Sequence, residues 1–148
     1  MSIAATFFAI DRYRLRGLVI DPATVSGFLR TPAEQEGPHA RQTVEQAWDV
    51  VRTLLPAAVD GEFLEGTDGM GCVYLTASHV ERSAERLARL DVQALAQDFA
   101  SDPDGFAQLY WATFWQENAQ GLLAFLQGVQ RFFADAAARR DAVVFFIV

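Results

Sequence analysis

The sequence has 148 residues, of which 51% are hydrophobic, and it carries a formal net charge of −7. A chain of this length fits one domain over residues 1–148 and buries about 70% of the surface that its unfolded form exposes. The negative charge argues against a nucleic-acid binder, because such proteins gain affinity by neutralising phosphates. No apolar run reaches the ~18 residues of a membrane span, which argues against a membrane partner.

Cys72 is the single cysteine, which excludes an internal disulfide and favours a reducing compartment. Residues 1–10 are apolar but lack the basic start and the cleavage site of a signal peptide. We therefore expect a cytoplasmic protein.

The first part of the chain predicts a strand and two short helices. Residues 3–10 (IAATFFAI) favour a strand that is too apolar for an exposed edge. Asp11 can cap a helix over residues 12–18, and Pro22 suits the first position of a second helix. Residues 31–41, which include His39, contain prolines, a glycine and mixed charge, and this composition indicates a loop.

The middle of the chain predicts the clearest internal helix, then an acidic loop and a strand. Thr43 and Gln46 form a capping-box pattern, and the apolar positions after them lie on one face of a helix that Pro56 ends. Residues 60–71 (DGEFLEGTDGMG) indicate a glycine-rich acidic loop with room for a strand around residues 62–64. Residues 72–75 (CVYL) predict a short strand.

The rest of the chain predicts further helices and a final buried strand. Thr76, Asp91 and Asp102 stand where they can cap three helices, the last of them running through Leu109. A long helix follows the aromatic segment, with apolar residues at steps of three and four. Residues 142–148 (AVVFFIV) show no polar alternation, which is typical of a strand covered on both faces in the middle of a sheet.

Together these elements predict a single small α/β domain of mixed α+β character. We expect a short central sheet of about three or four strands that includes the N- and C-terminal strands, surrounded by about six helices. Because the terminal strands have no polar face, helices are expected to cover both faces of the sheet.

Three segments of the sequence carry a family resemblance. They are VEQAWDVVRTLL (residues 44–55), VYLTASHVERSAERLARL (residues 73–90), and LYWATFW (residues 109–115) with the helix and strand that follow it. These segments resemble the YfbM-like family of uncharacterised bacterial proteins, and the resemblance covers nearly the whole chain. It implies one α/β domain with helices around a small sheet. It implies no catalytic residues, because the activity of the family is not established.

The glycine-rich loop does not match a known ligand-binding motif. Residues 66–71 (GTDGMG) precede a strand instead of joining a strand to a helix, and Asp68 stands where a phosphate loop carries lysine. A calcium loop beginning at Asp60 needs an oxygen ligand at its fifth position, where this chain has Leu64. We therefore predict no metal and no cofactor.

Cys72 and His79 are the candidate nucleophile and base, but no glycine elbow or oxyanion motif accompanies them. A core thiol and a surface histidine explain the pair better. His39 and His79 lack the spacing of a zinc site. The sequence therefore predicts no catalytic residues and favours a protein that is not an enzyme.

An aromatic segment over residues 110–117 is the feature that folding explains least. On a helix it would present more aromatic surface than one buried stripe can cover, and tyrosine and tryptophan anchor partners well. The candidate binding residues are Trp48, Tyr74, Tyr110, Trp111, Trp115 and Glu117.

Three hypotheses follow for the function. The first is a non-catalytic cytoplasmic module that binds a protein partner through residues 110–117. The second is a small-molecule site in the same region. The third is a small hydrolase that uses Cys72 and His79 or the acidic loop. The sequence does not indicate the oligomeric state.

Overall fold

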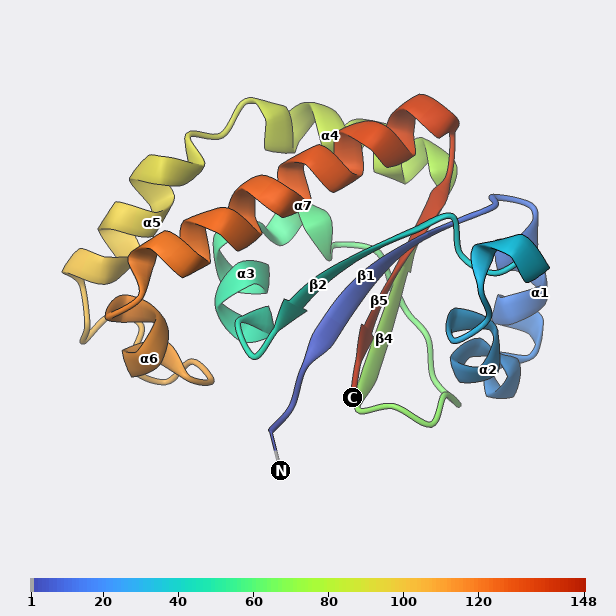
Figure 1. The fold of residues 1–148 in the computed structure, drawn as a ribbon, viewed down its shortest axis with the longest axis horizontal. Coiled ribbons are helices and arrows are strands. Elements are labelled where there is room, and N and C mark those ends of the chain that lie inside the picture. The colour runs from blue at the N-terminus through green and yellow to red at the C-terminus, as the bar shows by residue number, and fades with distance from the viewer. Residues whose placement is uncertain (1) are drawn as a thin grey trace.

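A computed structural model describes residues 2–148, in which five strands form one sheet with seven α-helices around it (Figure 1). The strands are β1 (Ala5–Ile10), β2 (Ala40–Glu45), β3 (Glu62–Phe63), β4 (Gly71–Leu75) and β5 (Ala142–Ile147). The helices are α1 (Arg14–Ile20), α2 (Val25–Leu29), α3 (Trp48–Leu54), α4 (Ala77–Ala88), α5 (Val92–Ser101), α6 (Ala112–Gln116) and α7 (Ala119–Arg139). Short 3-10 turns lie at η1 (Pro22–Thr24), η2 (Ala33–Gln35) and η3 (Pro56–Ala58).

The strand order is β2-β1-β5-β4-β3, and every neighbouring pair is antiparallel. The prediction that both terminal strands lie inside the sheet is confirmed, because β1 has β2 and β5 beside it and β5 has β1 and β4. A short strand within residues 62–64 is also confirmed, as β3. The mixed α+β fold class is confirmed. The expected strand number of about three or four is too low, because the sequence predicts the end of a loop and the start of a helix where the structure has the strand β2.

Successive residues of the central strands alternate between two apolar cores, one on each face of the sheet. Phe7 and Phe145 belong to the larger core, where their ring centroids lie 4.5 Å apart beneath α3 to α7. Phe8 and Val144 face the smaller core, which α1 and α2 cover. Full burial of such a side chain stabilises the fold by about 2–3 kcal/mol. Helices on both faces are therefore confirmed.

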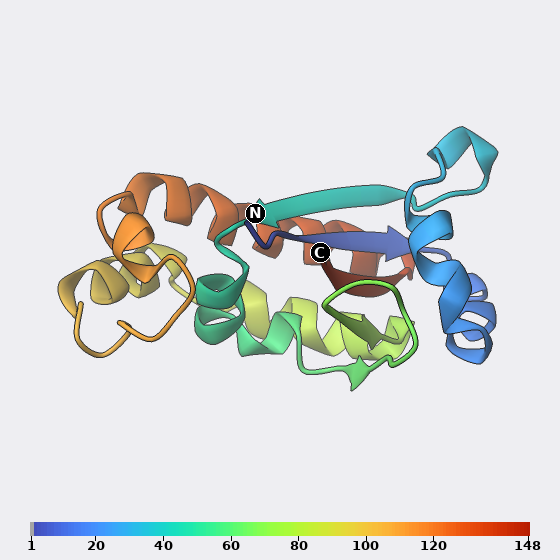
Figure 2. The same cartoon turned by 90° about the horizontal axis from the view of Figure 1, so that it is seen from below.

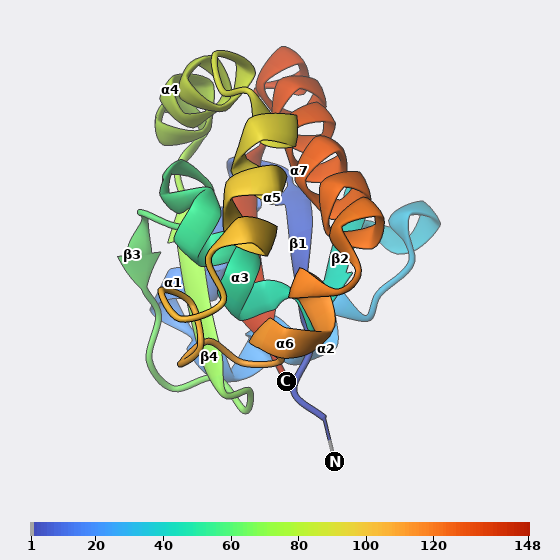
Figure 3. The same ribbon diagram turned by 90° about the vertical axis from the view of Figure 1, so that its left-hand side faces the viewer.

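The long helix α7 lies across the larger core with α4 and α5 beside it, as Figures 1 and 3 show. Its spacing was predicted correctly, since the same apolar positions are fully buried: Leu122, Leu126, Val129, Phe133 and Ala136. No helix within residues 2–148 has both the length and the apolar character that a bilayer crossing requires.

The predicted helix before Pro56 is present as α3, but its predicted start at Thr43 is wrong, because residues 40–45 pair with β1 as the edge strand β2. The spacing of apolar residues suggests one continuous helix, because Val44, on the strand, and Val51, on α3, both pack in the larger core. Glu45 ends the strand in a left-handed conformation with φ of 46°, and the helix begins only at Trp48. β-Branched Thr43 and Val44 suit the strand that β1 needs at its open edge.

Some of the other predicted helix boundaries are confirmed and others are corrected. Thr76 caps α4 through the His79 amide, and Asp91 caps α5 through the Ala94 amide, both as predicted. Residues 102–109 form turns and no helix, since the Asp102 carboxylate accepts a hydrogen bond from the Gly105 amide and closes a local turn. The predicted helix over residues 12–18 instead forms two residues later, as α1.

The two ends of β1 carry different structures. At its start lie α3, α5 and α6, whereas α1 and α2 lie at its other end, as seen from below in Figure 2. The candidate sites described next occupy these two ends.

Candidate functional site

The aromatic segment is only partly helical. Trp111 precedes α6 in a left-handed conformation with φ of 58°, so Tyr110 and Trp111 lie outside that helix. A bulky side chain rarely adopts this conformation, which costs about 1–3 kcal/mol unless the surroundings impose it. The segment is therefore held in place by contacts elsewhere.

Those contacts come from α3 and from the chain before β1. The buried Asp49 carboxylate accepts a hydrogen bond of 2.9 Å from the Tyr110 amide. Ile3 donates its N–H to the Tyr110 hydroxyl over 2.9 Å and accepts from Trp48 Nε1 over 3.1 Å. Tyr110 and Trp48 thus fix the start of the chain as well as the turn that displays Trp111.

The aromatic rings form a continuous row from α3 to α7. The ring centroids of Trp48 and Tyr110 lie 5.7 Å apart, Tyr110 stacks on Trp111 at 6.0 Å, and Trp111 meets the edge of Phe114 at 5.5 Å. The row then enters the core through Trp115 and Phe125. We call its outer members, Trp48, Tyr110, Trp111 and Phe114, the aromatic surface.

The predicted binding residues differ in accessibility. Trp111 is 42% exposed and Phe114, which was not among them, is 48% exposed. Trp115 is buried, and its Nε1–H has no hydrogen-bond partner among residues 2–148. Glu117 is exposed beside α6. Tyr74 packs against the smaller core on the opposite face of the sheet, so the structure does not bring it to the others.

Cys72 and His79 are not brought together. Cys72 faces the smaller core, and His79 begins α4 on the other face. Burial raises the pKa of the Cys72 thiol from 9.0 to about 12, which keeps it protonated and unreactive near neutral pH. His79 instead contacts Asp60 through Nε2 at 2.7 Å.

The acidic loop makes contacts with side chains and gathers no metal ligands. Asp60 pairs with His79 and Arg86, and Asp68 accepts a hydrogen bond from the Ser26 hydroxyl. Within residues 2–148, the histidine, cysteine and acidic side chains form no group of three that could hold a metal ion.

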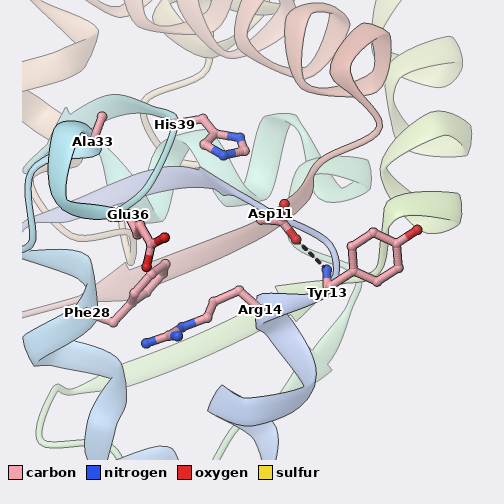
Figure 4. A pocket seen from close by; sticks show the side chains of 8 residues that line it. Asp11, Tyr13, Arg14, Phe28, Ala33, Glu36 and His39 are labelled. Carbon is pink, nitrogen blue, oxygen red and sulfur yellow. Dashed lines mark hydrogen bonds between the residues drawn. The ribbon is translucent and has the colours of Figure 1, made fainter.

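A polar pocket of about 520 Å³ lies at the other end of β1, between α1, α2 and the turn η2 (Figure 4). Arg14 and Phe28 form one wall, with the Arg14 guanidinium 5.0 Å from the ring centre, and Asp11 and His39 form another. A second pocket of about 410 Å³ adjoins it, because Asp11, Tyr13 and His39 line both.

His39 lies in the loop before β2, as predicted, and its contacts fix it in this pocket. Its amide donates to Ala9 at the end of β1, over 2.8 Å. Its Nδ1 lies 3.0 Å from the buried Asp141 carboxylate, which also accepts from Arg139 Nε over 2.8 Å. A carboxylate can only accept, so Nδ1 carries the proton and Nε2 remains available to a ligand.

The sheet topology explains why the sequence did not indicate this group. Asp11 follows β1, His39 precedes β2 and Asp141 precedes β5. β1 is antiparallel to both neighbours, so its end lies beside the starts of β2 and β5. The residues meet only once β2 is recognised as a strand.

The family profile described as "Domain of unknown function (DUF1877)" matches residues 1–146. The chain belongs to the DUF1877 family. The fold is similar to the crystal structure of YfbM, a protein of unknown function from Escherichia coli, with a TM-score of 0.69 and 14% sequence identity over 98% of this chain and 99% of that one. No curated protein matches the chain. The predicted resemblance to YfbM-like proteins is confirmed, and it carries no activity with it.

Proposed function

We propose that the chain is a non-catalytic binding module, and that its aromatic surface holds a protein partner. One observation carries the proposal. Trp111 is 42% exposed although its backbone adopts a strained left-handed conformation, which Asp49 helps to impose. Folding alone would favour glycine or asparagine at such a position. A strained backbone that displays a large aromatic side chain is typical of functional sites.

The charges around the aromatic surface indicate the chemistry of the partner. Glu117 is exposed next to α6, and Gln116 Nε2 donates to the Asp102 carbonyl, which places the acidic turn at residues 102–104 beside that helix. Arg52 lies over the Trp48 ring at 5.1 Å and pairs with Asp49. We expect a partner segment that places an apolar side chain on Trp111 and Phe114 and flanks it with lysine or arginine.

The alternatives of a small molecule at residues 110–117 and of a hydrolase have less support. The pocket of about 520 Å³ lies at the other end of β1, away from the aromatic surface. A thiol hydrolase needs a reactive thiolate near a base, and Cys72 and His79 lie on opposite faces of the sheet.

Affinity capture followed by reconstitution tests the proposal. A partner captured from lysate is purified and titrated against the wild-type protein, Trp111→Asn and the control Phe63→Asn. Asparagine tolerates the left-handed conformation at position 111, and Phe63 is an exposed aromatic residue on β3. We expect Trp111→Asn to weaken binding at least tenfold and the control to change it less than twofold.

If Trp111→Asn and Phe114→Ala both bind the partner as tightly as the wild-type protein does, the aromatic surface is not the interface. If no stoichiometric partner is captured, a thermal-shift screen of metabolites tests the small-molecule alternative.

A further inference from the structure

We propose that the two adjoining pockets at the end of β1 bind a small phosphorylated molecule with a planar apolar body. This inference is independent of the aromatic surface, because it concerns different residues at the opposite end of β1. It rests on three observations: the local excess of arginine, the fixed orientation of His39, and the difference between the smaller pocket, which three arginines line, and the larger pocket, where Arg14 stacks on Phe28.

Arginine gathers at this site in a protein that is acidic overall. The chain has 19 acidic and 12 basic residues. The two pockets reverse the ratio, since Arg12, Arg14, Arg139 and Arg140 line them with only Asp11, Glu36 and Asp141 as acids. Asp141 is already neutralised by Arg139 and His39, and the Asp11 carboxylate accepts from the Tyr13 amide.

Arg140 is the cation that folding explains least. Its guanidinium forms no ion pair with any residue of 2–148. Its backbone is left-handed with φ of 60° at the end of α7, where glycine is the usual residue. Arg140 lines the smaller pocket together with Arg12 and His39. Arginine is well suited to phosphate, because its planar fork of N–H donors matches phosphoryl oxygens.

His39 supplies a further directed donor. The buried Asp141 holds Nδ1, so Nε2 is the ring nitrogen left for a ligand, and when Nε2 also carries a proton it can donate to a phosphoryl oxygen. Asp141, which is 3% exposed, is the deeply buried charged residue of this site, and it contacts His39 on the Nδ1 side of the ring.

The larger pocket suits the remainder of the ligand. Phe28 with the stacked Arg14 gives one flat wall, and Tyr13, which is 76% exposed, lies where the two pockets join. A volume of about 520 Å³ falls in the range of small-molecule sites. A planar group can stack here while its phosphate reaches Arg12, Arg140 and His39.

Titration with phenyl phosphate tests the inference on the intact protein. Binding is followed by calorimetry and by the NMR signals of the His39 ring, with inorganic phosphate, benzoate and phenol as comparison probes. We expect saturable binding of phenyl phosphate, at least fivefold weaker binding of inorganic phosphate and of benzoate, and none of phenol. No saturation in the millimolar range, or equal binding of benzoate or phenol, would overturn the inference.

The informative variant is Arg140→Gly, which removes the cation and suits the left-handed backbone, so the fold is retained. We expect it to weaken phenyl phosphate binding at least tenfold. The matched control Arg131→Ala removes an exposed arginine of the same helix outside these pockets and should change binding less than twofold. Equal affinities for wild type and Arg140→Gly would show that the arginine serves only the helix end, and the proposal would fall.

Discussion

The two ends of β1 are stabilised in different ways. At the start of the strand, aromatic rings and one buried carboxylate hold the turn before α6. At its end, arginines and a histidine surround another buried carboxylate. Each end contains two non-glycine residues in the left-handed region, Glu45 and Trp111 at the start of β1 and Glu36 and Arg140 at the other end. The comparison teaches that the backbone is strained at both ends of β1. The strained residues lie beside the aromatic surface at one end and beside the arginine-lined pocket at the other.

Replacing Phe7 by alanine should have the largest effect, because this fully buried ring lies between the two ends and touches Phe132, Phe133 and Phe145. We expect the free energy of unfolding to fall by about 3–5 kcal/mol. Denaturation followed by tryptophan fluorescence reports the aromatic end, and the His39 NMR signal reports the other. The two probes should show one shared transition; separate midpoints would show that the ends unfold independently.

Asp49→Ala should come next and should affect one end only. It leaves the Tyr110 amide without its acceptor and Arg52 without its partner, so we expect a loss of about 1–3 kcal/mol in unfolding free energy. The tryptophan emission should change while the His39 signal stays in place. Asp135→Ala, at an exposed acid of α7, is the control and should alter neither probe.

The thiol of Cys72 gives a pH-dependent prediction for the smaller core. Its pKa is raised by burial from 9.0 to about 12, so the folded state keeps the proton that the unfolded state loses first. Stability should therefore fall as the pH rises above about 9, and Cys72→Ala should flatten this dependence. Urea denaturation at pH 7.5 and at pH 10 measures it. A wild-type protein as stable at pH 10 as at pH 7.5 would contradict the assignment.

The smallest effects concern two of the left-handed residues, Arg140 and Trp111. Arg140→Gly should raise the unfolding free energy by about 1 kcal/mol, because glycine suits the left-handed backbone and the guanidinium has no ion pair to lose within residues 2–148. Trp111→Gly relieves similar strain but loses contacts with Tyr110 and Phe114, so we expect a change near zero or a small loss. Thermal unfolding of both variants compares them directly. A destabilised Arg140→Gly would indicate a structural role for that side chain.

The local sequence pattern is sufficient to predict much of the fold. The central strand β5, the buried face of α7 and the caps at Thr76 and Asp91 could be predicted because each depends on residues close in sequence. The edge strand β2 could not, since its single buried side chain, Val44, continues the apolar spacing of the helix that follows. Residues 40–45 form a strand because they pair with β1, and that pairing is a long-range interaction.

Dependence on long-range contacts also explains why one candidate site could be predicted from the sequence and the other could not. The aromatic segment is contiguous, so its composition alone marked it, although the turn at Trp111 and the burial of Trp115 depended on contacts with distant residues. The pocket at the other end combines Asp11, His39 and Asp141, each beside a different strand. No spacing rule connects positions that only the sheet order brings together.

The position of β5 has a consequence for synthesis of the protein on the ribosome. Residues 142–147 lie between β1 and β4, so both of those strands have an unpaired edge until this last segment has emerged. Unpaired apolar strands are prone to association with other chains, and pairing across so long a separation is slow. Nascent chains that stop before residue 142 should therefore need chaperone protection, whereas β5 can complete the sheet in a single step once it is available.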